Sequence, residues 1–233
     1  MTPSAFRAFT FDCYGTLIDW EQGMLRALRA LPGLDADDDA LLAAFARHEH
    51  AIQEEHPAML YPEVLGRVAK AIAADFGRAA SDTKAAAFGA SIADWPPFPD
   101  TVAALDYLKQ HGLLVVLSNV DRASFAESAR RLGDPFHAVV TAEDVGSYKP
   151  APAHFARAKA LLAKDGIAPG EILHVAQSLF HDVQPGRAAG LATCWIDRRA
   201  GRPGGATPPV DVEPDIRFTD LAQLAAWHRA GGG

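Results

Sequence analysis

Reactive side chains gather in four short segments of this chain. Asp12 follows the apolar segment 8–11, Ser118 ends the apolar segment 113–117, and Lys149 and Asp182 lie in the third and fourth segments. A carboxylate at the end of a buried strand can attack a substrate and form a covalent ester, which divides one displacement into two easier steps. We therefore predict that Asp12 is a nucleophile, although an isolated aspartate at a strand end would more often cap a turn.

Neutral and cationic groups accompany this carboxylate. Thr16, Ser118 and Asn119 are neutral donors that can orient Asp12 and hold an anionic group of a substrate. The ammonium of Lys149 can keep Asp12 ionised and balance the charge of the substrate. We predict catalytic roles for Thr16, Ser118 and Lys149, and substrate binding by Asn119.

The fourth segment combines a histidine with a carboxylate. Asp182 precedes an expected helix and is suited to cap its N-terminus. His181 is the side chain in this segment that can donate a proton near neutral pH, which would help a poor leaving group such as an amine to depart. A histidine at a helix start that faces solvent is the alternative interpretation.

The remaining pattern predicts how these segments are positioned. In residues 19–95, apolar residues recur three and four positions apart, which predicts about four helices without a strand. The proline-rich segment 95–100 is expected to be a stiff connection from these helices to the rest of the chain. Helices then alternate with short apolar segments, which predicts βαβ units and a mostly parallel sheet covered on both faces. The predicted fold is α/β, with a doubly wound parallel-sheet core (1–18 and 96–233) and an all-helical cap (19–95) inserted after the first strand.

The four reactive segments then become loops at one edge of the sheet. In a doubly wound sheet the ligand crevice lies beyond the carboxyl ends of the strands, so the loops 12–16, 118–122, 147–149 and 177–182 are expected to meet there. A Gly/Pro-rich loop is predicted over 201–215, and the C-terminal glycines are expected to fray.

Composition narrows the class of ligand. The net charge is −7, and the 22 Lys and Arg residues are spread along the chain, which disfavours a nucleic-acid partner. Cys13 and Cys194 do not make a disulfide framework, which indicates a reducing cytoplasm. No apolar run approaches the roughly 20 residues that span a bilayer, so we expect no membrane partner. A small organic anion is the expected substrate.

The four segments also resemble a known set of motifs. FDCYGTL (11–17), LSN (117–119), SYKP (147–150) and AQSLFHD (176–182) resemble the four ordered motifs of the haloacid dehalogenase superfamily, and the helices between the first two resemble its cap. The resemblance implies a Rossmann-like core. It also implies that Asp182 lies beside Asp12, where it can position or deprotonate the water that hydrolyses an ester.

Two positions depart from the phosphatases of that superfamily. Tyr14 replaces the second aspartate of the first motif, and Gln177, preceded by Ala176, replaces the first acidic residue of the fourth. The carboxylates of Asp12 and Asp182 alone make a poor Mg²⁺ site, so we expect no metal or organic cofactor. Without the metal and the acid, phosphoryl transfer loses its main electrostatic aids, and a leaving group that departs as a stable anion is favoured.

The first motif is similar to that of the L-2-haloacid dehalogenase branch, which reads Asp-x-Tyr-Gly-Thr. This resemblance implies that Asp12 attacks C2 of a 2-haloalkanoate, expels halide and forms an ester that water hydrolyses to a 2-hydroxy acid of inverted configuration. Ser118 and Asn119 would hold the substrate carboxylate, and Tyr14 would line the pocket. A homodimer, as in related dehalogenases, would fit the apolar helix faces.

The match to that branch is incomplete. Ser178 and Leu179 follow Gln177 where serine and asparagine are expected, and Phe155 stands where a tyrosine is usual. The arginine that receives halide has no clear counterpart; Arg47 is nearest by position, and Arg122 is another cation close to the site. Trp20 and Gln177 are expected to contact the substrate from the cap and the fourth motif.

Three other functions stay open. They are a Mg²⁺-dependent phosphatase with a modified site, a hydrolase that opens a strained cyclic amino acid with the help of His181, and a catalytically silent binding protein. The presence of Asp12, Ser118, Lys149 and Asp182 together disfavours the last.

Overall fold

A parallel β-sheet forms the centre of the protein. The computed structural model describes residues 1–31, 33–201 and 210–231. Its six-stranded sheet has the order β3-β2-β1-β4-β5-β6, and every neighbouring pair is parallel. The predicted α/β class and doubly wound sheet are confirmed. The strands are β1 (Ala8–Phe11), β2 (Leu113–Ser118), β3 (Ala138–Thr141), β4 (Ile172–Ala176), β5 (Ala192–Ile196) and β6 (Ile216–Phe218).

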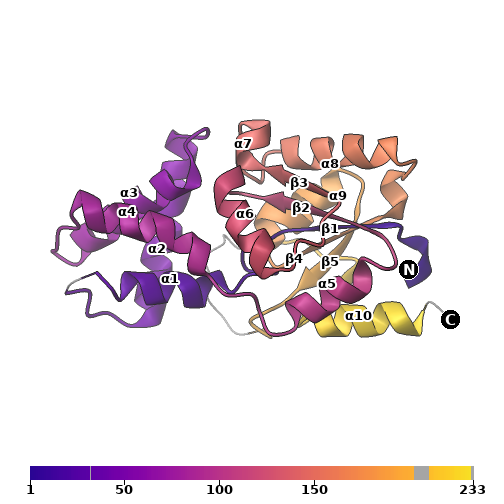
Figure 1. Cartoon of the computed structure of the whole chain (residues 1–233), viewed down its shortest axis with the longest axis horizontal. Coiled ribbons are helices and arrows are strands. Elements are labelled where there is room, and N and C mark those ends of the chain that lie inside the picture. The colour runs from indigo at the N-terminus through magenta and orange to yellow at the C-terminus, as the bar shows by residue number, and fades with distance from the viewer. Residues whose placement is uncertain (32, 202–209, 232–233) are drawn as a thin grey trace.

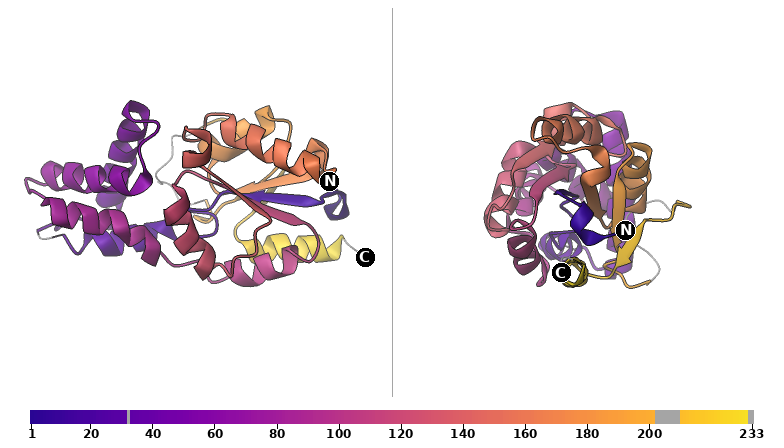
Figure 2. Two further views of the ribbon diagram at one scale, coloured as in Figure 1. Left: turned by 45° about the horizontal axis from the view of Figure 1, so that its top comes forward. Right: turned by 90° about the vertical axis from the view of Figure 1, so that its right-hand side faces the viewer.

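Helices cover both faces of this sheet (Figures 1 and 2). Phe9 and Phe11 of β1 share a hydrophobic cluster with α5 (Thr101–Leu108), α6 (Arg122–Arg131) and α10 (Leu221–Ala230). Ala8 shares a second cluster with α8 (Ala153–Lys164). Successive side chains of a strand point to opposite faces, so a strand that is covered on both sides is apolar along its whole length.

Four helices separate β1 from α5. They are α1 (Trp20–Leu28), α2 (Asp38–Glu55), α3 (Tyr61–Asp75) and α4 (Asp82–Ala90), followed by a 3₁₀ turn at Ser91–Asp94. We call this set the helical block. It lies beyond the carboxyl end of β1 (Figure 1), and its helices agree with those predicted. The division of the chain into domains after residues 18 and 95 stays a prediction.

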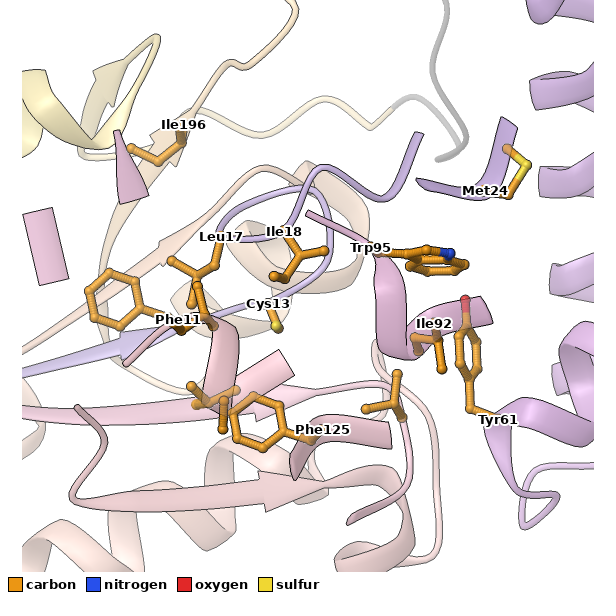
Figure 3. Close-up of a cluster of buried hydrophobic side chains, with 14 of the residues drawn as sticks. Phe11, Cys13, Leu17, Ile18, Met24, Tyr61, Ile92, Trp95, Phe125 and Ile196 are labelled. Carbon is orange, nitrogen blue, oxygen red and sulfur yellow. The ribbon is translucent and has the colours of Figure 1, made fainter. Parts of the chain in front are cut away.

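An apolar junction joins the helical block to the sheet. Trp95 is 1% exposed and lies near Ile92 and Tyr61 (Figure 3). Its ring also meets that of Tyr14 edge to face, with 5.7 Å between the centroids. A Cβ atom on Gly23 of α1 would lie 2.4 Å from the indole, so only glycine permits this approach. The junction holds the helical block over the end of the sheet.

Two short helices lie in or just before the reactive loops. One is α7 (Ala142–Val145), which the sequence did not predict, and the other is a π-helix at Leu179–Val183 that continues into α9 (Gln184–Ala188). The side chain of Ser178 caps the π-helix by accepting a hydrogen bond from the backbone N of His181 at 2.9 Å. The prediction that Asp182 caps this helix is therefore wrong.

Some predictions concern segments that the structure does not fully cover. Of the loop predicted over 201–215, residues 202–209 lie outside the described residues, as do residues 232–233 of the glycine terminus. Within the described ranges, no helix has the length and apolar character needed to cross a membrane.

Candidate active site

The four predicted loops meet around a cavity between the sheet and the helical block. Strand β1 lies between β2 and β4, so Asp12, Ser118 and Gln177 leave neighbouring strands at the same edge. The cavity has a volume of about 90 Å³, which suits a small organic molecule. It is lined by Asp12, Tyr14, Trp20, Glu21, Phe45, Glu49, Gln53, Tyr61, Asn119, Val120, Lys149, Gln177, Ser178, His181 and Asp182.

Both oxygens of the Asp12 carboxylate are held by hydrogen bonds. Thr16 Oγ1 donates to Oδ2 at 2.7 Å, and Lys149 Nζ donates to Oδ1 at 2.9 Å. Burial raises the pKa of the Asp12 carboxyl, and the ammonium of Lys149 acts in the opposite direction. A carboxylate that has lost its water shell but remains beside a cation is oriented and strongly basic, as a nucleophile requires.

All three N–H groups of the Lys149 ammonium donate hydrogen bonds within the site. Besides Asp12, Nζ donates to the carbonyl oxygen of Leu117 at 2.8 Å and to Asp182 Oδ1 at 2.7 Å. Burial lowers the pKa of Lys149, but the two carboxylates outweigh it, and the pKa is raised overall. Asn119 fixes the backbone of Lys149: its Oδ1 accepts from the backbone N at 2.6 Å, and its Nδ2 donates to the backbone O at 3.1 Å. Asn119 therefore positions Lys149 as well as lining the cavity.

A buried histidine supports Asp182. His174 Nε2 lies 3.2 Å from Asp182 Oδ1, and its Nδ1 lies 2.8 Å from Thr10 Oγ1. Although burial alone would raise it, the pKa of Asp182 is lowered far below its usual range by Lys149 and His174. Its second oxygen, Oδ2, has no hydrogen-bond partner among the described residues, which leaves it free to accept one from a water. Sequence reasoning missed His174, whose only signal was a polar residue within an apolar strand.

Tyr14, Trp20 and Gln177 all line the cavity. The hydroxyl of Tyr14 is 2.8 Å from Ser128 Oγ, and burial raises the pKa of the phenol well above its usual value. The ring of Trp20 packs at 5.2 Å from that of Phe45. The backbone N of Gln177 donates to Thr16 Oγ1 at 2.9 Å, which connects the first and fourth loops.

His181 lines the cavity but does not have the expected acidity. Burial lowers the pKa of His181 to about 4, because the protonated imidazolium loses its hydration. The imidazole is neutral at pH 7, so the prediction that His181 supplies a proton near neutral pH is wrong.

Two predicted residues lie away from the cavity. The guanidinium of Arg47 pairs with Asp75, its side chain is 61% exposed, and it does not line the cavity, which argues against a role as halide ligand. Arg122 likewise pairs with acidic residues, Glu143 and Asp144, on the surface. Ser118 is fully buried and also does not line the cavity, and its Oγ has no partner among the residues described.

The helical block contributes a wall that sequence reasoning did not identify. Phe45, Glu49 and Gln53 are four residues apart on α2 and all line the cavity. The hydroxyl of Tyr61 donates a hydrogen bond to Glu49 Oε1. Burial raises the pKa of Glu49 to about 7. The spacing of four was the available signal, but on a helix with several polar residues it did not distinguish this face from the exposed one.

The raised pKa of Glu49 predicts a pH-dependent difference in stability. Between pH 4.5 and about 7 the folded protein retains a proton on Glu49 that the unfolded chain has lost, so the wild type loses stability as the pH rises through this range. We expect the Glu49→Gln variant to become more stable relative to the wild type as the pH rises from 5 to 8. The readout is the difference between their free energies of unfolding, measured by urea denaturation at each pH. A difference that stays constant with pH would contradict the assigned titration.

The carboxylates do not fit the magnesium site of phosphatases. Asp12 and Asp182 share one ammonium, Lys149 Nζ, at 2.9 and 2.7 Å, and Gln177 offers an amide where a further carboxylate would complete the donor set. Mg²⁺ requires near-octahedral oxygen coordination. No group of three or more His, Cys, Asp or Glu side chains suited to a metal occurs in the described part of the chain.

Comparisons with known proteins identify the family and agree with the fold. Residues 6–190 match the family of haloacid dehalogenase-like hydrolases. The chain is 26% identical to (S)-2-haloacid dehalogenase H-109 of Pseudomonas putida over 93% of its length and 95% of the relative. The crystal structure of the L-2-haloacid dehalogenase PA0810 superposes with a TM-score of 0.79 at 26% identity, covering 97% of this chain and 99% of that chain. N-acylneuraminate-9-phosphatase of Rattus norvegicus is 34% identical, but over only 47% of this chain and 44% of the phosphatase.

Proposed function

We propose that this chain, which belongs to the family of haloacid dehalogenase-like hydrolases, displaces a leaving group from C2 of a small 2-substituted carboxylic acid, with halide as the leaving group. The observation that carries the proposal is the buried Asp12 carboxylate, oriented by Thr16 and Lys149 at a cavity with an incomplete magnesium site. The product is a 2-hydroxy acid.

In the first step, a carboxylate oxygen of Asp12 forms a bond to C2 as the carbon–halogen bond breaks. The bonding electrons leave with the halide, and C2 inverts. Lys149 holds Asp12 in one orientation through a 2.9 Å hydrogen bond, which lowers the entropic cost of attack. The substrate carboxylate binds to Asn119, which lines the cavity, and to the backbone of the loop after β2.

The leaving group receives no proton from the position two residues after Asp12. A Tyr14 phenol with a raised pKa is a poor acid, and its hydroxyl already contacts Ser128. A halide ion departs without protonation, whereas an alkoxide leaving from a phosphate ester is helped by an acid. This difference favours halide over a phosphate ester.

In the second step, water attacks the carbonyl carbon of the aspartyl ester. The bond between this carbonyl carbon and the ester oxygen then breaks. The ester oxygen, which came from Asp12, stays on C2 as the hydroxyl of the 2-hydroxy acid, and Asp12 is regenerated with one oxygen from water. Asp182 is ionised, and its unpartnered Oδ2 orients the attacking water by accepting a hydrogen bond from it. One proton of this water ends on the hydroxyl of the product, and the other passes to solvent.

A paired activity assay tests this proposal. Halide release from (S)-2-chloropropionate is measured in the presence of EDTA, beside hydrolysis of p-nitrophenyl phosphate with Mg²⁺. We expect halide release that EDTA does not affect and little phosphatase activity. Hydrolysis of the phosphate ester alone would overturn the proposal and support a modified phosphatase instead.

Isotope labelling tests the ester intermediate. One turnover in H₂¹⁸O with enzyme in excess should leave the label in the Asp12 carboxylate, detected by peptide mass spectrometry, and not in the product. Label found directly in the product would mean that water, and not Asp12, attacks C2.

A further inference from the structure

The wall of the cavity that the helical block contributes carries a carboxylate with no cationic partner among the described residues. Glu49 on α2 lines the cavity and accepts a hydrogen bond from Tyr61, but forms no ion pair with a described residue. Its basic neighbours are engaged elsewhere: Arg47 and His48 contact Asp75, and His50 contacts Glu54. Glu49 is half-buried, and a carboxyl group that is partly withdrawn from water without a counter-ion either keeps its proton or gains from a ligand that supplies a positive charge.

The net charge of all the side chains that line the cavity also favours a ligand with a positive charge. Four carboxylates line the cavity, and Lys149 is the one lysine or arginine among the described lining residues. Its three N–H groups are already used by Asp12, Leu117 and Asp182. Arg199 neutralises Glu21 from outside the cavity through two contacts at 3.1 Å. A plain monoanion therefore enters a cavity with an excess of negative charge.

We propose that Glu49, assisted by Tyr61, receives a protonated amine of the substrate, so that the preferred substrate is a small amino-bearing carboxylic acid and not a simple 2-haloalkanoate. The carboxylate of such a zwitterion faces the loops of the sheet, and its ammonium faces α2. The raised pKa of Glu49 agrees with this role, because a cation bound there would stabilise the ionised form. The reaction itself rests on the proposed function, whereas the binding preference can be measured without turnover.

A pair of substrates that differ by one ammonium group tests the proposal. Halide release is compared for 2-chloropropionate and 3-amino-2-chloropropionate, and the ratio of their kcat/KM values is the readout. We expect the wild type to favour the amino compound by about 10-fold or more, the effect of a hydrogen bond between charged groups. Glu49→Gln should lower this ratio by a similar factor. Glu54→Gln is the matched control, because Glu54 lies on the same helix with a side chain 72% exposed, and it should leave the ratio unchanged.

Binding of unreactive ligands separates this proposal from the reaction. The affinities of propionate and 3-aminopropionate are measured by calorimetry on the wild type and Glu49→Gln. Tighter binding of the amino compound by the wild type, lost in the variant, supports the ammonium site even if neither chloro compound reacts. Equal affinities in the wild type overturn the ammonium site, and this result does not depend on whether the variant folds.

Discussion

Replacing Asp12 with asparagine is expected to lower kcat for halide release by about 10⁴-fold or more, because the variant loses the nucleophile. The amide keeps the size and shape of the side chain but cannot form the ester. Thr16 and Lys149 would still lie within hydrogen-bonding distance of this position. The loss should therefore appear in kcat with little change in the fold, measured by halide release and circular dichroism.

Asp82→Asn provides the matched control for Asp12→Asn. Asp82 also pairs with a lysine, Lys70, but its side chain is 94% exposed and lies outside the cavity. We expect this variant to retain full turnover. Substantial halide release by Asp12→Asn, in protein shown by mass spectrometry to retain the asparagine, would remove Asp12 from its assigned role.

Replacing Lys149 with methionine is expected to reduce the free energy of unfolding by about 3–5 kcal/mol at pH 7, because the change removes one partner of a buried ion pair. The ammonium lies between Asp12 and Asp182, and all three side chains are almost completely buried. Without it, two carboxylates repel each other in a region of low polarity. Urea denaturation of both proteins at pH 7 measures the difference.

The dependence of this loss on pH identifies its cause. In the wild type, the lowered pKa of Asp182 gives stability that is present above its unfolded value of 3.8 and is lost as the pH falls. In Lys149→Met, protonation of the carboxylates relieves their repulsion, so the difference between the two proteins should shrink from pH 7 to pH 4. Lys70→Met, which breaks the exposed pair with Asp82, should cost less than about 1 kcal/mol at either pH. A loss in Lys149→Met that does not change with pH would indicate lost packing and not lost charge.

The order of the apolar segments along the chain and the spacing of the apolar residues within them were enough to predict the architecture. Apolar segments of four to six residues between helices predicted a parallel sheet, because strands buried on both faces are largely apolar, as Ala8–Phe11 is apart from Thr10. The four reactive loops could be placed together for the same reason: carboxyl ends of parallel strands share one edge. Lys149 does lie within hydrogen-bonding distance of both Asp12 and Asp182, which stand in neighbouring loops.

Residues on helices were much harder to assign. Arg47 and Glu49 are two positions apart in the same segment of α2, and helical geometry directs them to different sides. Arg47 pairs with Asp75 on the surface, whereas Glu49 lines the cavity. The sequence did not reveal which side of α2 faces the sheet, because that depends on tertiary packing, such as the contact of Phe45 with Trp20.

The sequence by itself predicted the class of fold and the loops that meet, since these follow from the order and apolar character of the strands. It also singled out Asp12, Lys149 and Asp182, by residue type and by the resemblance of their segments to known motifs. Only the tertiary structure decided how each group titrates and which side chains the helical block contributes. Burial makes His181 neutral and raises the pKa of Glu49 to about 7, and both effects depend on which atoms surround the group and not on its neighbours in the chain.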